Sequence, residues 1–314
     1  MSLTDQSHPA TVRTVLGELD PAELGVCDAH DHLFLRSPLL AGQELADPAA
    51  AERELRAFAA LGGRALVQWT PYGMGRRRGE LVRLARATGV HLVGATGLHQ
   101  ARHYEPEWLR SLDLAELFVA DLTAAQAPAG LIKTAGEYHG LGGHARWVMT
   151  AAAEAHHATG APIAVHHELG TGPLQVLELL CGELGVPPRS VLLGHLNRFP
   201  DARLHRKAAE SGAYVVLDGP SRAHHATDHH LFDTVADLIE SGHADQLLFG
   251  GDTTTAAALA EVGPTHLVSA LRPRLAAEFG EELAHRVFTT NPARAFAARW
   301  RLPLRAAAES PDRP

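Results

Sequence analysis

Apolar runs alternate with helix-like stretches along nearly the whole chain, and this alternation most constrains the fold. Eight runs rich in Val, Ile, Leu and Ala end in polar residues or glycine at fairly even spacing. They cover residues 26–33, 64–70, 91–97, 130–135, 162–167, 191–196, 213–218 and 246–251. The stretches between them repeat apolar residues every three or four positions, as amphipathic helices do, for example 50–61, 79–87, 114–125 and 145–159. In 314 residues, eight such units predict an α/β fold with a parallel sheet closed into a (β/α)8 TIM barrel.

An open, doubly wound parallel sheet is the alternative architecture. It is less favoured because no Gly-x-Gly-x-x-Gly motif follows the first run. Hydrophobic residues make up 46% of the chain, which is enough for one large core, so we expect a single domain over residues 1–305. Residues 306–314 are polar and contain proline, and we expect them to form a disordered tail.

Composition narrows the classes of partner. The formal net charge is −8 and the arginines are scattered, so neither nucleic acid nor an anionic membrane is an expected partner. A small molecule is the expected substrate. Cys27 and Cys181 show no pairing pattern, and residues 1–13 lack the apolar segment of a signal peptide or membrane span. These features predict a cytoplasmic protein.

Side chains that can bind metal stand at the ends of five of the eight runs. His30 and His32 are two residues apart, so on a strand they face the same side. Such a pair is expected by chance about once in a chain this rich in histidine. It indicates a metal site only because four later runs also end in residues that can bind metal. Strand ends meet at one face of a barrel, which predicts a single cluster of nitrogen and oxygen ligands suited to Zn²⁺ or a similar ion. Its members are His30, His32, Lys133, His166, His195 and Asp252.

Lys133 is unusual because this chain normally uses arginine for positive charge. Of 28 basic residues, only Lys133 and Lys207 are lysine. Burial and nearby cations lower a lysine pKa toward the neutral amine, which can add CO2 and become a carbamate able to bridge two metal ions. The alternative is an ordinary lysine whose stem packs at the strand end while its amine reaches water.

Other histidines and one cysteine are expected to lie away from the cluster. His167 should point to the opposite face from His166 and be structural. Cys27 has the opposite parity to His30, so we expect it to pack outward against the helices. The remaining pairs are treated as surface residues: His156 and His157, His224 and His225, His229 and His230.

With these residues assembled, the chain resembles the phosphotriesterase-like branch of the amidohydrolase superfamily, including its lactonases. The resemblance runs over nearly the whole length, through residues 14–17, 23–25, 30–32, 70–76, 131–133, 162–166, 194–195, 252 and 291–296. It implies that His30, His32 and Asp252 hold one ion, and that His166 and His195 hold the other. Carboxylated Lys133 would bridge two divalent ions, most commonly Zn²⁺ with Mn²⁺ or Co²⁺ as substitutes, and Asp252 would accept a proton from the attacking bridging hydroxide.

Within that family, two segments are similar to members that open sugar lactones, some of them phosphorylated. They are residues 194–201 and 217–222, where organophosphate-hydrolysing members instead carry histidines at the positions of Gly219 and Arg222. The resemblance implies that Arg222, His99 and Arg198 bind substrate. The chain departs from the pattern at His99, where lactonases often have Tyr, at residues 223–225, and in a shortened stretch after Asp252.

The leading functional hypothesis is therefore a lactonase, and several alternatives stay open. The same attack on phosphorus or on an amide carbonyl would give a phosphotriester or aryl ester hydrolase, or an N-acyl amide hydrolase. A catalytically silent barrel that binds a small molecule is the non-enzyme alternative. Similar proteins are often homodimers, so we expect a dimer here.

Overall fold

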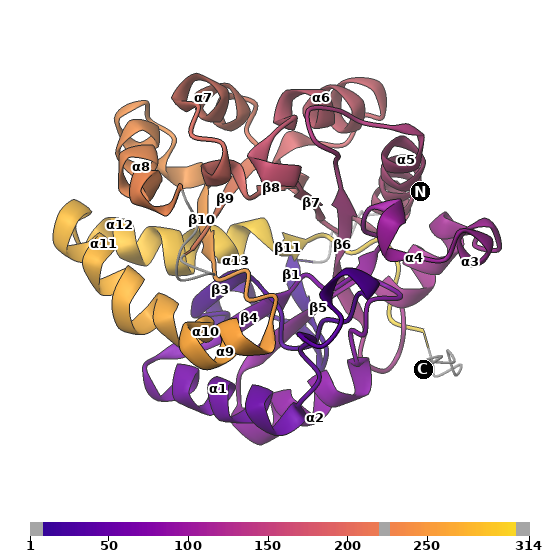
Figure 1. Ribbon diagram of the computed structural model, residues 1–314, viewed down its shortest axis with the longest axis horizontal. Coiled ribbons are helices and arrows are strands. Elements are labelled where there is room, and N and C mark those ends of the chain that lie inside the picture. The colour runs from indigo at the N-terminus through magenta and orange to yellow at the C-terminus, as the bar shows by residue number, and fades with distance from the viewer. Residues whose placement is uncertain (1–8, 220–226, 306–314) are drawn as a thin grey trace, which may run out of the picture.

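Eight parallel strands form a barrel surrounded by helices (Figure 1). The computed structural model describes residues 9–219 and 227–305, and all structural statements here concern that part of the chain. The barrel strands are β3 Val26–Asp31, β4 Gly63–Gln68, β5 His91–Gly97, β6 Ala129–Ala135, β7 Ile163–His166, β8 Val191–Gly194, β9 Tyr214–Asp218 and β10 Leu247–Gly250. They pair in chain order from β3 to β10.

The barrel closes where its first strand meets its last, at a place we call the seam. Just beyond the end of β10, the backbone N–H of Asp252 donates to the carbonyl oxygen of His30 at 3.0 Å. The Gly251 N–H donates to the Asp28 carboxylate at 3.3 Å, and the Thr253 N–H donates to the Asp31 carboxylate at 2.8 Å. The prediction of a (β/α)8 barrel is confirmed, and the open sheet is wrong.

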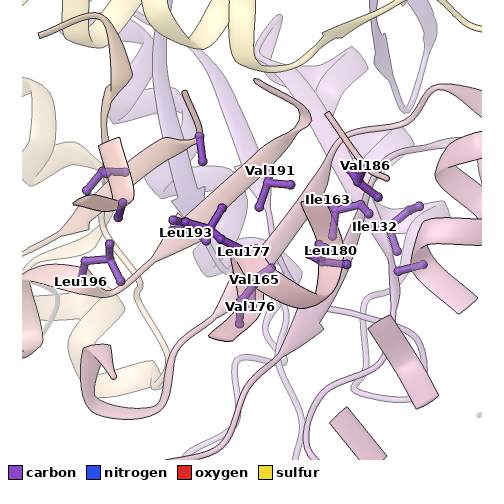
Figure 2. Close-up of a cluster of buried hydrophobic side chains, with 14 of the residues drawn as sticks. Ile132, Ile163, Val165, Val176, Leu177, Leu180, Val186, Val191, Leu193 and Leu196 are labelled. Carbon is purple, nitrogen blue, oxygen red and sulfur yellow. The ribbon is translucent and has the colours of Figure 1, made fainter. Parts of the chain in front are cut away.

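Both faces of the barrel strands are buried, as the apolar runs predict. In β4, Ala65 and Val67 belong to an interior cluster to which all eight barrel strands contribute, whereas Leu66 packs outward with the helices. Figure 2 shows the outer layer beside β7 and β8, where Ile163 and Val165 pack with Val176 of the following helix. Side-chain alternation thus separates a barrel core from a core between sheet and helices.

Helices follow most strands and cover the barrel. They are α1 Pro48–Ala60, α2 Arg78–Thr88, α3 Pro106–Arg110, α4 Leu114–Leu122, α5 Gly143–Thr159, α6 Pro173–Leu177, α7 Ala202–Glu210, α8 Leu231–Glu240, α9 Ala256–Glu261, α10 Gly263–His266, α11 Arg272–Phe279, α12 Glu281–His285 and α13 Asn291–Ala295. Aspartate side chains cap several of them: Asp47 accepts from Ala49 N at 2.8 Å, and Asp201 accepts from Leu204 N at 3.0 Å. No helix in the described part of the chain is long and apolar enough to cross a bilayer.

A small antiparallel sheet closes the amino end of the barrel. It pairs β1 Thr11–Thr14 with β2 Gly17–Leu19 and with β11 Ala297–Ala298. Val12 of β1 and Phe296 join the interior cluster. The amino end is thereby filled with apolar side chains, and the carboxyl end of the barrel is left for polar ones.

A β-bulge near the start of the barrel reverses the expected direction of Cys27. Asp28 pairs with Leu66 and Asp31 with Gln68, so three residues of β3 advance against two of β4. Counting alternate residues back from His30 across the bulge therefore assigns the residues before it to the wrong face of the strand. Cys27 lies in the interior cluster, and the expectation that it packs outward is wrong.

Candidate metal centre

His30, His32 and Asp252 converge at the seam. The Nε2 atoms of both histidines lie 3.5 Å from Oδ1 of Asp252, and all three side chains are buried. His32 Nδ1 contacts the Thr70 hydroxyl at 2.7 Å, and that hydroxyl donates to Phe34 O. The hydroxyl must therefore accept from His32 Nδ1–H, which leaves the lone pair of His32 on Nε2, facing Asp252.

The other two histidines of the cluster lie beside this group. The His195 ring is 4.9 Å from the His30 ring and 4.5 Å from the His166 ring, measured between centroids. His166 Nε2 lies 3.4 Å from the Glu168 carboxylate. Burial lowers the pKa of His166, and the neighbouring His195 and Lys133 lower it further. Burial also lowers the pKa of His195, so both imidazoles favour the neutral form that binds metal.

Lys133 is buried next to the histidines. Its Nζ lies 5.8 Å from the centre of the Trp69 ring, and that ring stacks on His30 at 3.9 Å. Burial lowers the pKa of Lys133 to about 8, although Asp252 and Asp218 act in the opposite direction. A lowered pKa increases the fraction of neutral amine, which is the form that adds CO2.

Close backbone packing allows Lys133 to reach this position. Gly97 of β5 has φ +101°, and a Cβ atom there would lie 1.9 Å from Lys133 O. A side chain at this residue would displace β6, so glycine is required at this point.

Two residues that the sequence analysis missed support the cluster from beneath. Asp218, at the end of β9, accepts a hydrogen bond from His30 Nδ1 at 2.7 Å with one oxygen. Its other oxygen lies 2.6 Å from His195 Nδ1. Trp69 forms the floor under His30 and donates to Ala29 O at 2.8 Å. In the sequence, Asp218 belongs to the segment 217–222, which we related only to substrate binding. Its position at the end of an apolar run could have identified it, because the metal ligands were predicted from the same kind of position.

Arg198 lies against the cluster itself. Its guanidinium pairs with Oδ2 of Asp252, and only 12% of the side chain is exposed. Burial alone would raise the pKa of Asp252, but the charge of Arg198, the largest opposing effect, brings it well below the usual value. Asp252 is therefore an anion, with Oδ1 toward His30 and His32 and Oδ2 toward Arg198.

His99 lies at the outer side of the same cluster. Its ring is 4.6 Å from the His166 ring and 4.5 Å from that of His103. His99 Nδ1 accepts from the backbone N–H of Gln100 at 2.7 Å. The pKa of His99 is well below its usual value because of burial, and next because of Lys133. A neutral ring with Nδ1 as acceptor carries its proton on Nε2.

The remaining histidines fall into two groups. His167 is buried and contacts Gly194 O at 3.2 Å, consistent with a structural role. His156 is also buried and donates from Nδ1 to Ala161 O at 2.7 Å, so the expectation of a surface position is wrong for this residue. His157 and His229 are exposed. Arg222, His224 and His225 lie outside the described residues, as does the expected tail at 306–314.

The cluster fits a divalent metal ion. His30 Nε2 is buried and has no hydrogen-bond partner among the described residues, although it faces Asp252. Ligand atoms of His30, His195 and Asp252 all lie within 4.8 Å of one another. An unpartnered imidazole nitrogen beside a carboxylate anion is costly when buried, and a cation bound between them would satisfy both.

Comparison with known proteins matches this geometry to one family. The sequence model of the Phosphotriesterase family matches residues 10–296. A phospho-furanose lactonase from Mycoplasmopsis agalactiae is 31% identical over 252 residues, covering 71% of this chain and 70% of the relative.

Two solved structures have the same fold and similar sequences. A lactonase from Listeria monocytogenes superposes with a TM-score of 0.85 and 27% identity, over 91% of this chain and 98% of that one. An organophosphorus hydrolase from Deinococcus radiodurans superposes with a TM-score of 0.82 and 26% identity, over 93% and 98% of the respective chains.

Proposed function

The chain belongs to the phosphotriesterase family, and on this premise we propose that it is a metal-dependent lactonase whose substrates are sugar lactones or similar small lactones. The observation that carries the proposal is the set of four imidazoles and one carboxylate, all buried except the partly exposed His166, with His30 Nε2 left unpartnered among the described residues. The relatives named as lactonases support the same reaction class.

We propose that this set holds two divalent ions and that both are Zn²⁺. His30, His32 and Asp252 would hold one ion, and His166 and His195 the other. Lys133, as a carbamate, would contribute an oxygen to each ion. When bound, such ions lower the pKa of water and polarise a carbonyl oxygen.

Residues of the chain then direct the opening of the ring. Water adds to the lactone carbonyl carbon, the bond from this carbon to the ring oxygen breaks, and the ring oxygen takes up a proton to leave a hydroxy acid. Asp252 is placed to accept the proton of the attacking water, because its carboxylate is ionised and faces the cluster. Arg198 holds the Asp252 oxygen that faces away from His30 and His32.

The substrate class rests on the similarity to a phospho-furanose lactonase and on Arg222. A guanidinium can bind a phosphate or carboxylate with two parallel hydrogen bonds. Loops that follow barrel strands line the substrate pocket, and Arg222 follows β9 in the sequence.

Replacing Arg222 tests this substrate assignment. Arg222→Ala should raise KM for charged lactones by about tenfold or more, the scale of one lost charge-assisted contact, and leave kcat nearly unchanged. Neutral lactones serve as the control and should respond much less. An equal change in KM for charged and neutral lactones would remove Arg222 as the anion contact.

The proposed activity is tested by measuring metal content and hydrolysis on the same protein. Purified protein loaded with zinc is assayed against sugar lactones, alkyl lactones, an aryl ester, a phosphotriester and an N-acyl amide, with acid release followed by a pH indicator. We expect about two ions per chain and highest kcat/KM on the sugar lactones. Folded protein that binds no zinc, or that binds zinc and opens no lactone, would contradict the proposal.

A further inference from the structure

Each imidazole of the candidate metal centre lies within 3.4 Å of a polar side chain other than the proposed ligands. Thr70 contacts His32 alone, at 2.7 Å, and Glu168 lies 3.4 Å from His166. Asp218 differs from both, because its two oxygens reach two histidines at 2.7 and 2.6 Å. Of those histidines, His30 is a proposed ligand of one ion and His195 is a proposed ligand of the other.

We propose that Asp218 is a positioning residue that couples the two halves of the centre, so that binding of one ion favours binding of the other. The inference rests on the proposed binuclear site. It requires no contact between Asp218 and either ion, since the carboxylate acts through the rings of His30 and His195.

The backbone holds Asp218 firmly enough for this role. The Asn197 side chain donates to Asp218 O at 2.7 Å and accepts from Asp218 N at 3.1 Å. Asp218 is about 1% exposed and sits at the carboxyl end of β9, so its carboxylate has little room to move. The same Asn197 precedes Arg198, which contacts Asp252. Both carboxylates nearest His195 are therefore positioned from one short segment.

Coupling follows from the chemistry of imidazole. A cation on one ring nitrogen makes the N–H on the other nitrogen a stronger donor, which tightens its bond to a carboxylate. An ion bound through His30 would therefore fix Asp218 in the orientation that holds His195. The contact between Asp218 and His195 Nδ1, at 2.6 Å, would be tightened in the same way by an ion bound through His195.

Zinc titration of metal-free protein tests the coupling without relying on activity. Wild type should take up two ions in one cooperative transition, measured by equilibrium dialysis and elemental analysis. Asp218→Ala should weaken both ions by about 10–100-fold each, the usual effect of losing such a partner. Thr70→Val is the matched comparison, because it removes the partner of His32 only and should weaken one ion.

Two further variants separate positioning from general loss of structure. Asn197→Ala weakens the hold on the Asp218 backbone but keeps the carboxylate, so it should lower the melting temperature and weaken both ions less than Asp218→Ala does. Asp218→Asn carries the test if the alanine variant does not fold. A carboxamide offers one acceptor and one donor, so it can support only one of the two imidazoles as a ligand, and uptake should split into two separate steps.

The outcomes separate this inference from the proposed function. Wild type that binds two ions independently, or an Asp218→Ala variant that remains folded and loses affinity for one ion or for neither, would overturn the coupling and leave the lactonase proposal intact. Wild type that binds no zinc would overturn both.

Discussion

Asp252 gives each of its carboxylate oxygens a different neighbour. Oδ1 faces His30 and His32, and Oδ2 is held by Arg198. Asp252 also has φ +50°, in the left-handed region, which costs a non-glycine residue about 1–2 kcal/mol. The hydrogen bond from its N–H to His30 O is one of the contacts that hold this conformation.

We predict that Asp252→Asn reduces kcat more than it reduces bound metal. An amide can still offer one oxygen to an ion, but it cannot accept the proton of attacking water. The expected loss in kcat is about 10²–10⁴-fold, the range for a general base. Elemental analysis of the same preparation gives the metal content, and a wild-type rate would leave Asp252 as a ligand only.

Lys133 allows a prediction that uses the rarity of lysine in this chain. Lys133→Arg and Lys133→Ala should both lose metal and lower kcat/KM by about 10²-fold or more, because neither can form a carbamate. Short carboxylic acids should partly restore the alanine variant by replacing the bridge. Lys207→Ala, which alters the other lysine at an exposed position of α7, is the control. Full activity of the arginine variant would refute carboxylation.

At the scale of elements, α5 shows how a helix end positions a ligand-bearing strand. His156 near the end of α5 donates to Ala161 O, just before β7, which carries His166. Burial lowers the pKa of His156 below its ordinary value of 6.5. As the pH falls below 6.5, the unfolded chain therefore binds a proton that the folded chain does not, and the free energy of unfolding decreases.

His156→Asn should make stability less dependent on pH. Asparagine can keep a donor to Ala161 O but does not titrate, so the loss of stability between about pH 7 and pH 5 should shrink. Urea unfolding at both pH values measures this, with His157→Asn at the exposed neighbouring residue as the control. An unchanged pH dependence in the His156 variant would mean that other groups dominate.

The strands and their polar ends were predictable because a barrel imposes a strict order on the chain. Apolar runs marked both ends of all eight strands to within two residues, and the six proposed ligands lie together at the strand ends. Cys27 was misplaced because a bulge in β3 shifts parity, and a bulge leaves no mark in apolar spacing. His156 was misplaced because its partner is a backbone carbonyl on the next connection, a contact that only tertiary structure creates.

On the scale of the whole molecule, one buried ionic network connects elements from the first half of the chain. Asp121 of α4 pairs with Arg76 at 2.6 Å and Arg78 at 2.7 Å, and it accepts from Thr96 of β5 at 2.7 Å. Burial raises the pKa of Asp121, but the two arginines more than reverse this effect. The network ties α4 to β5 and to the start of α2.

Asp121→Ala should lower the free energy of unfolding by about 3–5 kcal/mol, because it leaves two buried guanidinium groups without their shared anion. Equilibrium urea unfolding gives the value. The surface pair of Glu52 and Arg83 is the control, since solvent screens it and Glu52→Ala should change the free energy of unfolding far less. A loss below 1 kcal/mol for Asp121→Ala would show that other contacts of the two arginines suffice.

The seam of the barrel also determines when during synthesis the centre can exist. Asp31 and Thr253, which bond to each other across it, are 222 residues apart in the chain. His30 leaves the ribosome early, but its partner Asp252 is added only after the other seven strands. A nascent chain therefore lacks the complete set of proposed ligands until all eight barrel strands have been synthesised. A chain truncated before Asp252 would lack one of the six proposed ligands and could not complete the centre.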